Sequence, residues 1–331
     1  MKILVIRFSS IGDIVLTTPV LRCLHNQVPE AEIHFLTKKS FRNIVADNPY
    51  VHKVHVLTDS FELMLHELKM EEYDHIIDLH HNLRTLRIKR FLKGVPAVAF
   101  KKLNIEKYLL TNLKINLLPK KHIVQRNLDT VAFLGVQDDG KGLDYFIPEK
   151  DQVPQKDLPT AHVHGYIAMV IGAALETKQM PVHKWKELCA SIQHPIILLG
   201  GKEDIEMGKA IAASDEIKIY NACGKFNLNE SADLLRRSKI VITHDTGLMH
   251  IAAALQKPII SIWGNTAPAF GMYPFYGKNS NQQFDVVEVN GLWCRPCSKI
   301  GYHKCPKKHF KCMEQISINE IVRLLNLRLK A

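Results

Sequence analysis

One short stretch of the chain brings together a carboxylate, a hydroxyl, a glycine and an imidazole. These are Asp245, Thr246, Gly247 and His250. The apolar run 238–243 before them predicts a buried strand, and the small residues at 248–255 predict a short helix. The turn therefore lies where a parallel strand ends and a helix begins, which is where open α/β sheets bind ligands. Free backbone N–H groups at a helix N-terminus favour anions. The group suits a polyhydroxylated, phosphorylated ligand, although Asp-Thr is also an ordinary helix N-cap.

A second polar turn follows the first predicted strand and contains Ser9, Ser10, Gly12 and Asp13. It lacks the G-x-G-x-x-G pattern of dinucleotide-binding proteins and the Lys-Ser/Thr pair of a P-loop. The sequence leaves two interpretations of Asp13 open. Its carboxylate could cap the following helix, where N–H bonds would hold it ionised. It could equally act as a general base toward a hydroxyl within hydrogen-bonding reach.

Two loops of the C-terminal half carry side chains suited to a nucleotide. Lys178 follows the strand predicted at 166–171, and its ammonium could pair with a diphosphate or remain an ordinary surface charge. Gly200 and Gly201 allow a ligand to approach the backbone, and Glu203 beside them could accept a hydrogen bond from a ribose hydroxyl.

Positive charge is concentrated between Arg84 and Arg126. This stretch has twelve Lys and Arg and one acidic residue, Glu106, so its net charge equals the +11 of the whole chain. Apolar residues are interleaved through it, as in surfaces that meet a phosphorylated lipid or an anionic bilayer. A solvated basic face is the alternative. Nucleic acid is not an expected partner, because no recognition motif accompanies the charge.

Four of the seven cysteines form a cluster near the C-terminus: Cys294, Cys297, Cys305 and Cys312. Four thiolates could close a tetrahedral, structural zinc site, but the spacing matches no common zinc module closely. A reduced cluster that stabilises a loop is an alternative. Disulfides are another, although they are rare in a reducing compartment.

Short apolar runs alternate with helix-like segments along the chain, which is typical of doubly wound parallel sheets. Strands are predicted at 2–7, 32–36, 53–57, 75–78 and 95–100, then at 166–171, 195–199, 217–220, 239–243 and 258–262. A polar, proline-bearing stretch at 144–159 is the predicted linker. We therefore predict two Rossmann-like domains, 1–155 and 156–331, that face a cleft. The second contains the Cys-rich segment 294–312, and the sequence leaves open whether the last helix packs back on the first.

Composition places the chain among globular proteins. Its 331 residues are 46% hydrophobic and 23% charged. No apolar run reaches the length that crosses a bilayer, and the N-terminus lacks the apolar core of a signal peptide. We therefore expect a cytoplasmic location.

Taken together, these motifs resemble glycosyltransferase family nine, the ADP-heptose:lipopolysaccharide heptosyltransferases, over most of the chain. The resemblance rests on residues 2–13, 78–84, 177–185, 223–225 and 245–255. It implies an α/β GT-B fold, with the acceptor bound by the N-terminal half and the nucleotide-sugar by the C-terminal half. It also implies inverting, metal-independent transfer. Asp13 matches the position of the proposed base, and Lys178 matches the lysine that meets the donor phosphates.

Three residues depart from the pattern that the resemblance implies. Ala173 and Ala174 stand where small hydroxyl residues are frequent, and Met180 replaces a frequent Trp. These departures concern the sugar and base of the donor more than the class of reaction. Similar cysteine clusters occur in some relatives, so the cluster is no evidence of catalysis.

We therefore expect an enzyme that moves heptose from ADP-heptose to a phosphorylated glycolipid acceptor of the lipopolysaccharide inner core. It would need no cofactor and would work at the inner face of the cytoplasmic membrane, with Asp13 as base. The predicted donor-binding residues are Thr177, Lys178, Glu203, Asp245, Thr246, Gly247, Leu248 and His250. The predicted acceptor-binding residues are Ser9, Ser10, Gly12, Asn82, Arg84, Lys101, Lys102, Lys120 and Lys121. The alternatives are a GT-B transferase with another nucleotide-sugar and a non-catalytic protein that binds lipopolysaccharide or nucleotide.

Overall fold

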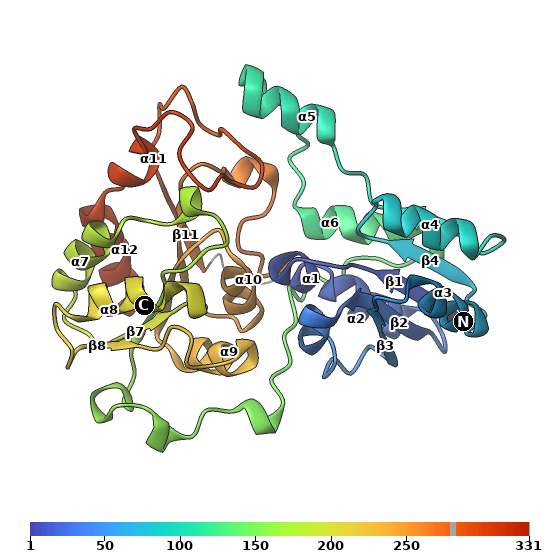
Figure 1. Ribbon diagram of the computed structural model, residues 1–331, viewed down its shortest axis with the longest axis horizontal. Coiled ribbons are helices and arrows are strands. Elements are labelled where there is room, and N and C mark those ends of the chain that lie inside the picture. Colours follow the sequence, from blue (N-terminus) through green and yellow to red (C-terminus); the bar gives the residue numbers. More distant parts are fainter. Residues whose placement is uncertain (279–282, 331) are drawn as a thin grey trace. The chain divides into compact units, whose positions relative to one another are not determined.

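A computed structural model describes residues 1–278 and 283–330 in two compact units (Figure 1). The first unit contains Met1–Leu103 and Lys121–Phe146, and the second contains Asn104–Lys120, Ile147–Tyr276 and the C-terminal part of the chain. This division differs from a single boundary after residue 155, because the segment 104–120 packs with the second unit. Leu110 of that segment is buried against Ala267 and Phe270.

The first unit is built on a five-stranded sheet in the order β3-β2-β1-β4-β5, and every pair of neighbouring strands is parallel. Its strands are β1 (Lys2–Ile6), β2 (Glu32–Lys38), β3 (Lys53–Leu57), β4 (His75–Asp78) and β5 (Ala97–Ala99). Its helices are α1 (Ile11–Val15), α2 (Thr18–Gln27), η1 (Lys39–Ile44), α3 (Phe61–Met70), α4 (Leu83–Phe91), α6 (Ile123–Leu128) and η3 (Asp129–Leu134). The strand order reverses between β1 and β4, and this switch point is where such sheets bind ligands.

The second unit repeats this plan with a six-stranded parallel sheet in the order β11-β10-β9-β6-β7-β8. Its strands are β6 (Ile167–Val170), β7 (Ile196–Leu199), β8 (Ile219–Asn221), β9 (Ile240–His244), β10 (Ile259–Trp263) and β11 (Phe284–Glu288). The order reverses between β6 and β9, which places the loops after these two strands at the second switch point.

The helices of the second unit include those between these strands, the segment 104–113 and the C-terminal helix. They are α5 (Asn104–Tyr108), the π-helical turn η2 (Leu109–Leu113), α7 (Val182–Ala190), α8 (Ile205–Ala212), α9 (Leu228–Arg237), α10 (Gly247–Ala254), α11 (Lys311–Glu314) and α12 (Ile318–Lys330). Short 3-10 turns are η4 (Glu149–Asp151), η5 (Gln155–Asp157), η6 (Thr160–His162), η7 (Glu176–Lys178), η8 (Lys202–Asp204) and η9 (Pro268–Phe270). Helix α12 packs against α7, β9, β10 and β11, all of the second unit.

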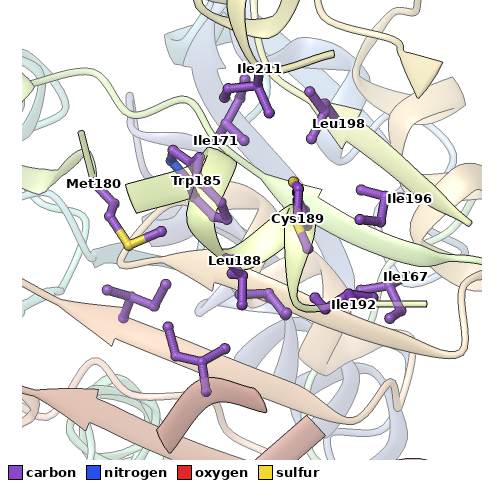
Figure 2. Packing of buried hydrophobic residues seen from close by; sticks show 14 of the residues in the cluster. Ile167, Ile171, Met180, Trp185, Leu188, Cys189, Ile192, Ile196, Leu198 and Ile211 are labelled. Carbon is purple, nitrogen blue, oxygen red and sulfur yellow. Dashed lines mark hydrogen bonds between the residues drawn. The ribbon is translucent and has the colours of Figure 1, made fainter. Parts of the chain in front are cut away.

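One hydrophobic core holds α7 to the second sheet, as Figure 2 shows. Trp185, Leu188 and Cys189 of α7 are fully buried against side chains of β6 and β7, such as Ile167 and Ile196. Removing such an aromatic side chain costs about 3–5 kcal/mol of stability in typical cores. The Trp185 ring also packs edge-on against His244, with 5.3 Å between ring centroids, so the core reaches the end of β9.

The predicted alternation of strands and helices is confirmed, with two local differences. Strand β11 was not predicted, because only Val287 of that edge strand is fully buried and its sequence has no continuous apolar run. The helix-like segment after β1 forms two helices, α1 and α2, in place of one. Pro19 in the first turn of α2 lacks the N–H that would continue a helix, and the Thr17 hydroxyl donates to the carbonyl of Ile14 at 2.7 Å.

Candidate active site

Asp13 lies in α1, after the loop that follows β1, and its carboxylate is bound on both oxygens. Oδ1 pairs with Arg7 Nη2 at 2.7 Å, and Oδ2 accepts from the backbone N–H and hydroxyl of Ser10 at 3.2 and 2.8 Å. Burial alone would raise the pKa of Asp13, but the charge of Arg7 and the Ser10 hydrogen bonds outweigh it and hold the pKa below its usual value. The carboxylate is therefore ionised, and both interpretations of Asp13 remain compatible with its geometry.

Arg7 also fixes the backbone around this turn. Its Nε donates to the carbonyl of Ser9 at 2.8 Å, and its Nη1 donates to that of Leu79 at 2.5 Å. Leu79 follows β4, so Arg7 links the two strand ends that flank the first switch point. Arg7 was not among the predicted site residues, because a single basic residue at the end of a strand gives no distinctive signal.

The end of β4 carries a fully buried carboxylate, Asp78. Its Oδ1 accepts from the backbone N–H groups of His80 and His81, and its Oδ2 pairs with Lys89 of α4 at 2.7 Å. Burial and the charge of Arg7 lower the pKa of His80 to about 4, so this imidazole is neutral at pH 7. Asn82, a predicted acceptor-binding residue, is the N-cap of α4 and accepts from the Thr85 N–H at 3.0 Å.

A basic hollow of about 820 Å³ lies near the same edge of the first sheet. Its lining residues are Lys38, Lys39, Ser40, Leu57, Thr58, Asp59, Phe61, Arg84 and Arg87. Four of these side chains are cationic and one is anionic, so the hollow suits a negatively charged, hydroxylated ligand. Of the predicted acceptor-binding residues, only Arg84 lines it.

The other basic residues of the stretch 84–126 are distributed over several elements and both units. Lys121 pairs with Asp129 at 2.6 Å, and the Lys101 carbonyl accepts from Arg126, whose guanidinium also lies over the Phe100 ring. Lys120 is exposed and belongs to the second unit, whereas Lys102 belongs to the first.

At the second switch point, Lys178 and Asp245 meet. Lys178 Nζ lies 2.7 Å from Asp245 Oδ2 and also donates to the Asp245 carbonyl at 3.1 Å. Thr266, a buried residue that was not predicted from the sequence, donates its hydroxyl to the same Oδ2 at 3.0 Å. Two loops far apart in sequence therefore hold one ammonium beside the start of α10, whose N-terminus favours anions.

The remaining predicted residues of this turn divide into half-buried and buried positions. Thr246 is the N-cap of α10, and its hydroxyl lies 3.4 Å from that of Thr243. Gly247 and Leu248 open the helix and are half-buried, whereas His250 is buried. His244, which precedes the turn, accepts from the Met180 N–H at 2.9 Å. Burial lowers the pKa of His244 to about 3, so this imidazole is neutral.

The Thr177 side chain makes hydrogen bonds within the second unit. Its hydroxyl donates to the Tyr302 carbonyl at 3.0 Å and accepts from the Tyr302 N–H at 2.8 Å. Arg295 holds the loop after β10, because its guanidinium donates to the carbonyls of Gly264 and Thr266 and pairs with Glu288. The Cys-rich segment thus supports the loop that holds Lys178 and the loop of Thr266, which contacts Asp245.

In the loop after β7, the buried carboxylate is Asp204 and not Glu203, which is exposed. Asp204 Oδ2 accepts from the Gly201 N–H at 2.8 Å. Burial raises the pKa of Asp204, and the neighbouring charge of Glu203 adds to this shift. A Cβ at Gly172 would lie 1.9 Å from the Asp204 carboxylate, so a glycine is required where the chain leaves β6.

The cysteines of the C-terminal cluster are free thiols in the structure. Burial raises the pKa of Cys312 to about 12, and the nearby Cys297, Cys305 and Cys294 add to the shift. Cys294 Sγ lies 3.8 Å from His309 Nε2. A zinc site at these four cysteines stays a prediction. Within the described part of the chain, no helix is both long and apolar enough to cross a membrane.

Curated proteins with similar sequences are lipopolysaccharide and lipooligosaccharide heptosyltransferases. A lipooligosaccharide heptosyltransferase 2 from Haemophilus influenzae is 28% identical over 82% of this chain and 85% of the relative. A lipopolysaccharide heptosyltransferase 1 from Campylobacter coli is 27% identical over 98% of both chains.

Solved structures show the same fold over nearly the whole chain. A glycosyl transferase family 9 protein from Veillonella parvula has a TM-score of 0.79 at 22% identity and covers 99% of this chain and 97% of its own. The ADP-heptose lps heptosyltransferase II of E. coli has a TM-score of 0.75 at 21% identity, covering 99% and 98%. The predicted GT-B fold is therefore confirmed.

The family model of glycosyltransferase family 9 (heptosyltransferase) matches residues 63–305, which include the basic hollow's Arg84, the Lys178–Asp245 pair and most of the Cys-rich segment. Each of the two Rossmann-like sheets has polar side chains at its switch point, where sheets of this kind bind their ligands. The chain belongs to glycosyltransferase family 9 and is a glycosyltransferase.

Proposed function

We propose that this glycosyltransferase transfers heptose from ADP-heptose to a phosphorylated acceptor of the lipopolysaccharide inner core. The similar curated proteins are named for heptosyl transfer to lipopolysaccharide or lipooligosaccharide. The Lys178–Asp245 pair at the second switch point is the observation that carries the proposal, because it supplies a cation beside a helix N-terminus where a diphosphate would bind.

In the donor site, Lys178 would contact the diphosphate, and Asp245 would position it. Asp245 Oδ2 already accepts from both Lys178 and Thr266, so the ammonium is held in place before a ligand arrives. A positioned cation costs little reorganisation as charge develops on the leaving group. With the N–H groups at the start of α10, Lys178 would meet this charge without a metal ion.

The acceptor would bind at the basic hollow of the first unit. Lys38, Lys39, Arg84 and Arg87 supply the positive charge that phosphorylated sugars require, and Ser40 and Thr58 supply hydroxyls for hydrogen bonding. The hollow extends the predicted acceptor set beyond Arg84 to residues outside the basic stretch.

Transfer would proceed by direct displacement with inversion. An acceptor hydroxyl attacks the anomeric carbon, the bond from that carbon to the diphosphate oxygen breaks, and ADP leaves. Asp13 takes the proton of the attacking hydroxyl, since its ionised carboxylate has an acceptor oxygen to offer. Arg7 would hold that carboxylate in a fixed orientation.

The decisive experiment incubates the purified chain with a Kdo–lipid A acceptor and ADP-heptose, with UDP- and GDP-sugars as control donors. Mass spectrometry should show the addition of one heptose with ADP-heptose alone, and NMR of the product should show an inverted anomeric centre. Turnover should persist in EDTA. If a sugar were instead added from a control donor, the protein would be a transferase for another nucleotide-sugar and not a heptosyltransferase. A retained anomeric configuration would contradict direct displacement.

We further propose that the second unit docks on an anionic bilayer through a surface formed by residues 104–120 and 293–308, here called the apolar-basic surface. Its exposed large side chains are Ile105, Tyr108, Leu113, Ile115, Leu117, Trp293, Ile300 and Tyr302. Lys114 joins the two segments, because its ammonium donates to the carbonyls of Cys294 and Pro296 at 3.2 and 2.7 Å. Lysines among apolar and aromatic side chains are typical of surfaces that lie at the membrane interface.

Vesicle co-sedimentation tests this docking surface. The chain should bind vesicles that contain phosphatidylglycerol and bind phosphatidylcholine vesicles weakly, and salt should reduce binding. The double variant Ile105→Ser, Leu117→Ser should bind less, whereas Ile217→Ser, which removes an exposed apolar side chain elsewhere in the same unit, should not. If the double variant and Ile217→Ser bound vesicles equally well, the apolar-basic surface would not be the site of membrane contact.

A further inference from the structure

A cluster of titratable side chains lies at the edge of the first sheet where the strands begin, away from Asp13. His34 lies near the start of β2, His55 lies on β3, and Glu71 and Tyr73 lie in the connection from α3 to β4. His34, His55 and Tyr73 are buried. Among the described residues, His34, His55 and Glu71 are the one group of three or more His, Cys, Asp or Glu whose ligand atoms lie within 4.8 Å of one another.

Three polar atoms of this cluster form a nearly equilateral triangle. His34 Nδ1 lies 3.2 Å from His55 Nε2, and the Tyr73 hydroxyl lies 3.0 Å from each of these nitrogens. Glu71 Oε2 lies 3.8 Å from His34 Nδ1, and Glu71 Oε1 lies 3.8 Å from His55 Nε2. The hydroxyl has one proton and can donate to only one of the two imidazoles at a time.

A second carboxylate fixes the direction in which His34 presents its lone pair. Glu32 Oε1 lies 2.9 Å from His34 Nε2, and a carboxylate can only accept there. The Nε2 atom therefore carries the hydrogen, and the Nδ1 lone pair points into the triangle. A carboxylate behind a histidine is the arrangement that orients metal-bound imidazoles in many proteins.

The geometry points to a structural binding site for a divalent cation of the Zn²⁺ class, with His34 Nδ1, His55 Nε2 and the Glu71 carboxylate as ligands and Tyr73 at the fourth position. Bond lengths of 2.0–2.1 Å in a tetrahedral zinc site place neighbouring ligand atoms about 3.3 Å apart. The distances of 3.0–3.8 Å in the cluster bracket this value. Two imidazoles and a carboxylate are donors that Zn²⁺ accepts readily.

Two lysines compete with the cation for Glu71. Lys53 Nζ lies 2.5 Å from Glu71 Oε1, and Lys2 Nζ lies 3.1 Å from Oε2. Lys53 is the more exposed of the two, so its ammonium can turn to solvent when a cation takes its place. The bound cation would join β2, β3 and the end of α3, and its effect would be on stability.

Titration with Co²⁺ tests the site, since Co²⁺ substitutes for Zn²⁺ and reports its ligands by absorption. Nitrogen and oxygen ligands give weak visible bands, whereas thiolates add an intense charge-transfer band in the near ultraviolet, so binding at Cys294–Cys312 is recognised separately. The expected result is a visible spectrum without the thiolate band that saturates at one Co²⁺ per chain and disappears when Zn²⁺ is added. Zn²⁺ should also raise the melting temperature.

Matched variants separate a cation site from a buried hydrogen-bond network. Glu71→Gln should abolish the visible spectrum, and Glu32→Gln should weaken binding about 10–100-fold through loss of the supporting carboxylate. Lys53→Met should strengthen binding, because it removes the competitor for Glu71. A hydrogen-bond network alone predicts that any visible bands in these proteins accompany the thiolate charge-transfer band.

The Lys53→Met result keeps the test decisive if Glu71→Gln fails to fold. The proposal is overturned if wild type and Lys53→Met give no Co²⁺ spectrum free of the thiolate band, or if Zn²⁺ raises the melting temperature of wild type and Glu71→Gln equally. Transferase turnover should not change in Lys53→Met, since this edge of the sheet is distant from the end of β1 that carries Asp13.

Discussion

Asp13 combines the chemistry of a base with the bonding of a helix cap. Ser10 and Arg7 occupy both of its oxygens, yet a carboxylate has acceptor capacity for more than one partner on each. The same contacts that hold Asp13 in place also lower its pKa, so that its basicity is modest. Its role is therefore decided by activity measurements on variants that keep the cap.

The substitution Asp13→Asn keeps size and capping ability and removes basicity. Turnover should fall by about two to four orders of magnitude, the usual contribution of a general base, with the circular dichroism spectrum unchanged. Asp47→Asn, at an exposed aspartate of the same unit, is the matched control and should leave turnover intact. A folded Asp13→Asn enzyme with nearly normal turnover would show that Asp13 is a cap and nothing more.

Arg7 should set the pH at which Asp13 loses activity. Asp13 must be ionised to accept a proton, so turnover should fall only as pH drops through its lowered pKa. Arg7→Gln removes the charge that lowers this pKa, so the acidic limb of the profile of kcat/KM against pH should move to higher pH. An unchanged limb would show that another group controls it.

Lys178→Ala should weaken donor binding by about 1.5–3 kcal/mol, the range for hydrogen bonds to charged groups. Turnover should fall as well, because the diphosphate gains charge as it leaves. Calorimetry with ADP and steady-state kinetics measure the two effects. Lys186→Ala, at an exposed lysine of α7, is the control, and equal behaviour of both variants would make Lys178 an ordinary surface charge.

At the scale of elements, the Cys-rich segment acts as a support for the donor loops. Thr177 bonds Tyr302 in both directions, and Arg295 grips the loop that carries Thr266. Thr266 in turn contacts Asp245, so the segment reaches the Lys178–Asp245 pair through a short series of hydrogen bonds. Thr177 thereby has a structural partner in addition to its predicted contact with the donor.

Thr177→Val should distinguish the two roles of this residue. Loss of the paired hydrogen bonds with Tyr302 should lower the free energy of unfolding by about 1–3 kcal/mol, because buried polar groups lose their partner. ADP affinity should stay close to that of the parent if the hydroxyl serves only Tyr302. Urea unfolding and calorimetry on the same preparation provide both values, and lost ADP affinity with unchanged stability would favour direct donor contact.

At the scale of the molecule, buried neutral histidines should make stability depend on pH. The pKa of His244 is lowered to about 3, whereas an unfolded histidine titrates near 6.5. As pH falls below about 6.5, His244 is protonated in the unfolded chain but stays neutral in the folded protein. The free energy of unfolding that this histidine contributes is therefore fully present above this pH and declines toward pH 3. His80, with a pKa of about 4, acts in the same direction.

Urea unfolding at pH 7 and at pH 4.5 should therefore show a lower free energy of unfolding at the acidic pH. One such histidine contributes at most about 1.4 kcal/mol per pH unit. His244→Gln keeps an acceptor for the Met180 N–H and should reduce the slope. A slope that is the same in parent and variant would assign the acid sensitivity to other groups.

The sequence by itself determined the class of fold and the polar turns that follow its strands. Strands that are buried on both faces are continuous apolar runs, so their alternation with helices predicts the two parallel sheets. A polar turn after such a run must lie at the edge of the sheet, and this rule places the turns of Asp13, Lys178 and Asp245 there. Edge strand β11 was not predicted, because a half-exposed strand has no continuous apolar run.

Only the tertiary structure decided which of these residues meet. Lys178 and Asp245 are far apart in sequence, and their contact follows from the order of strands, which puts β6 beside β9. The basic stretch 84–126 is one segment of sequence, yet its residues belong to two units and several of its cations are held by internal partners. The local sequence shows where charge is, but not which charges meet. The hollow with Lys38, Lys39 and Arg84 exists only because the fold brings separate elements together at one edge of the first sheet. The cluster of His34, His55 and Glu71 forms in the same way at the edge where the strands begin.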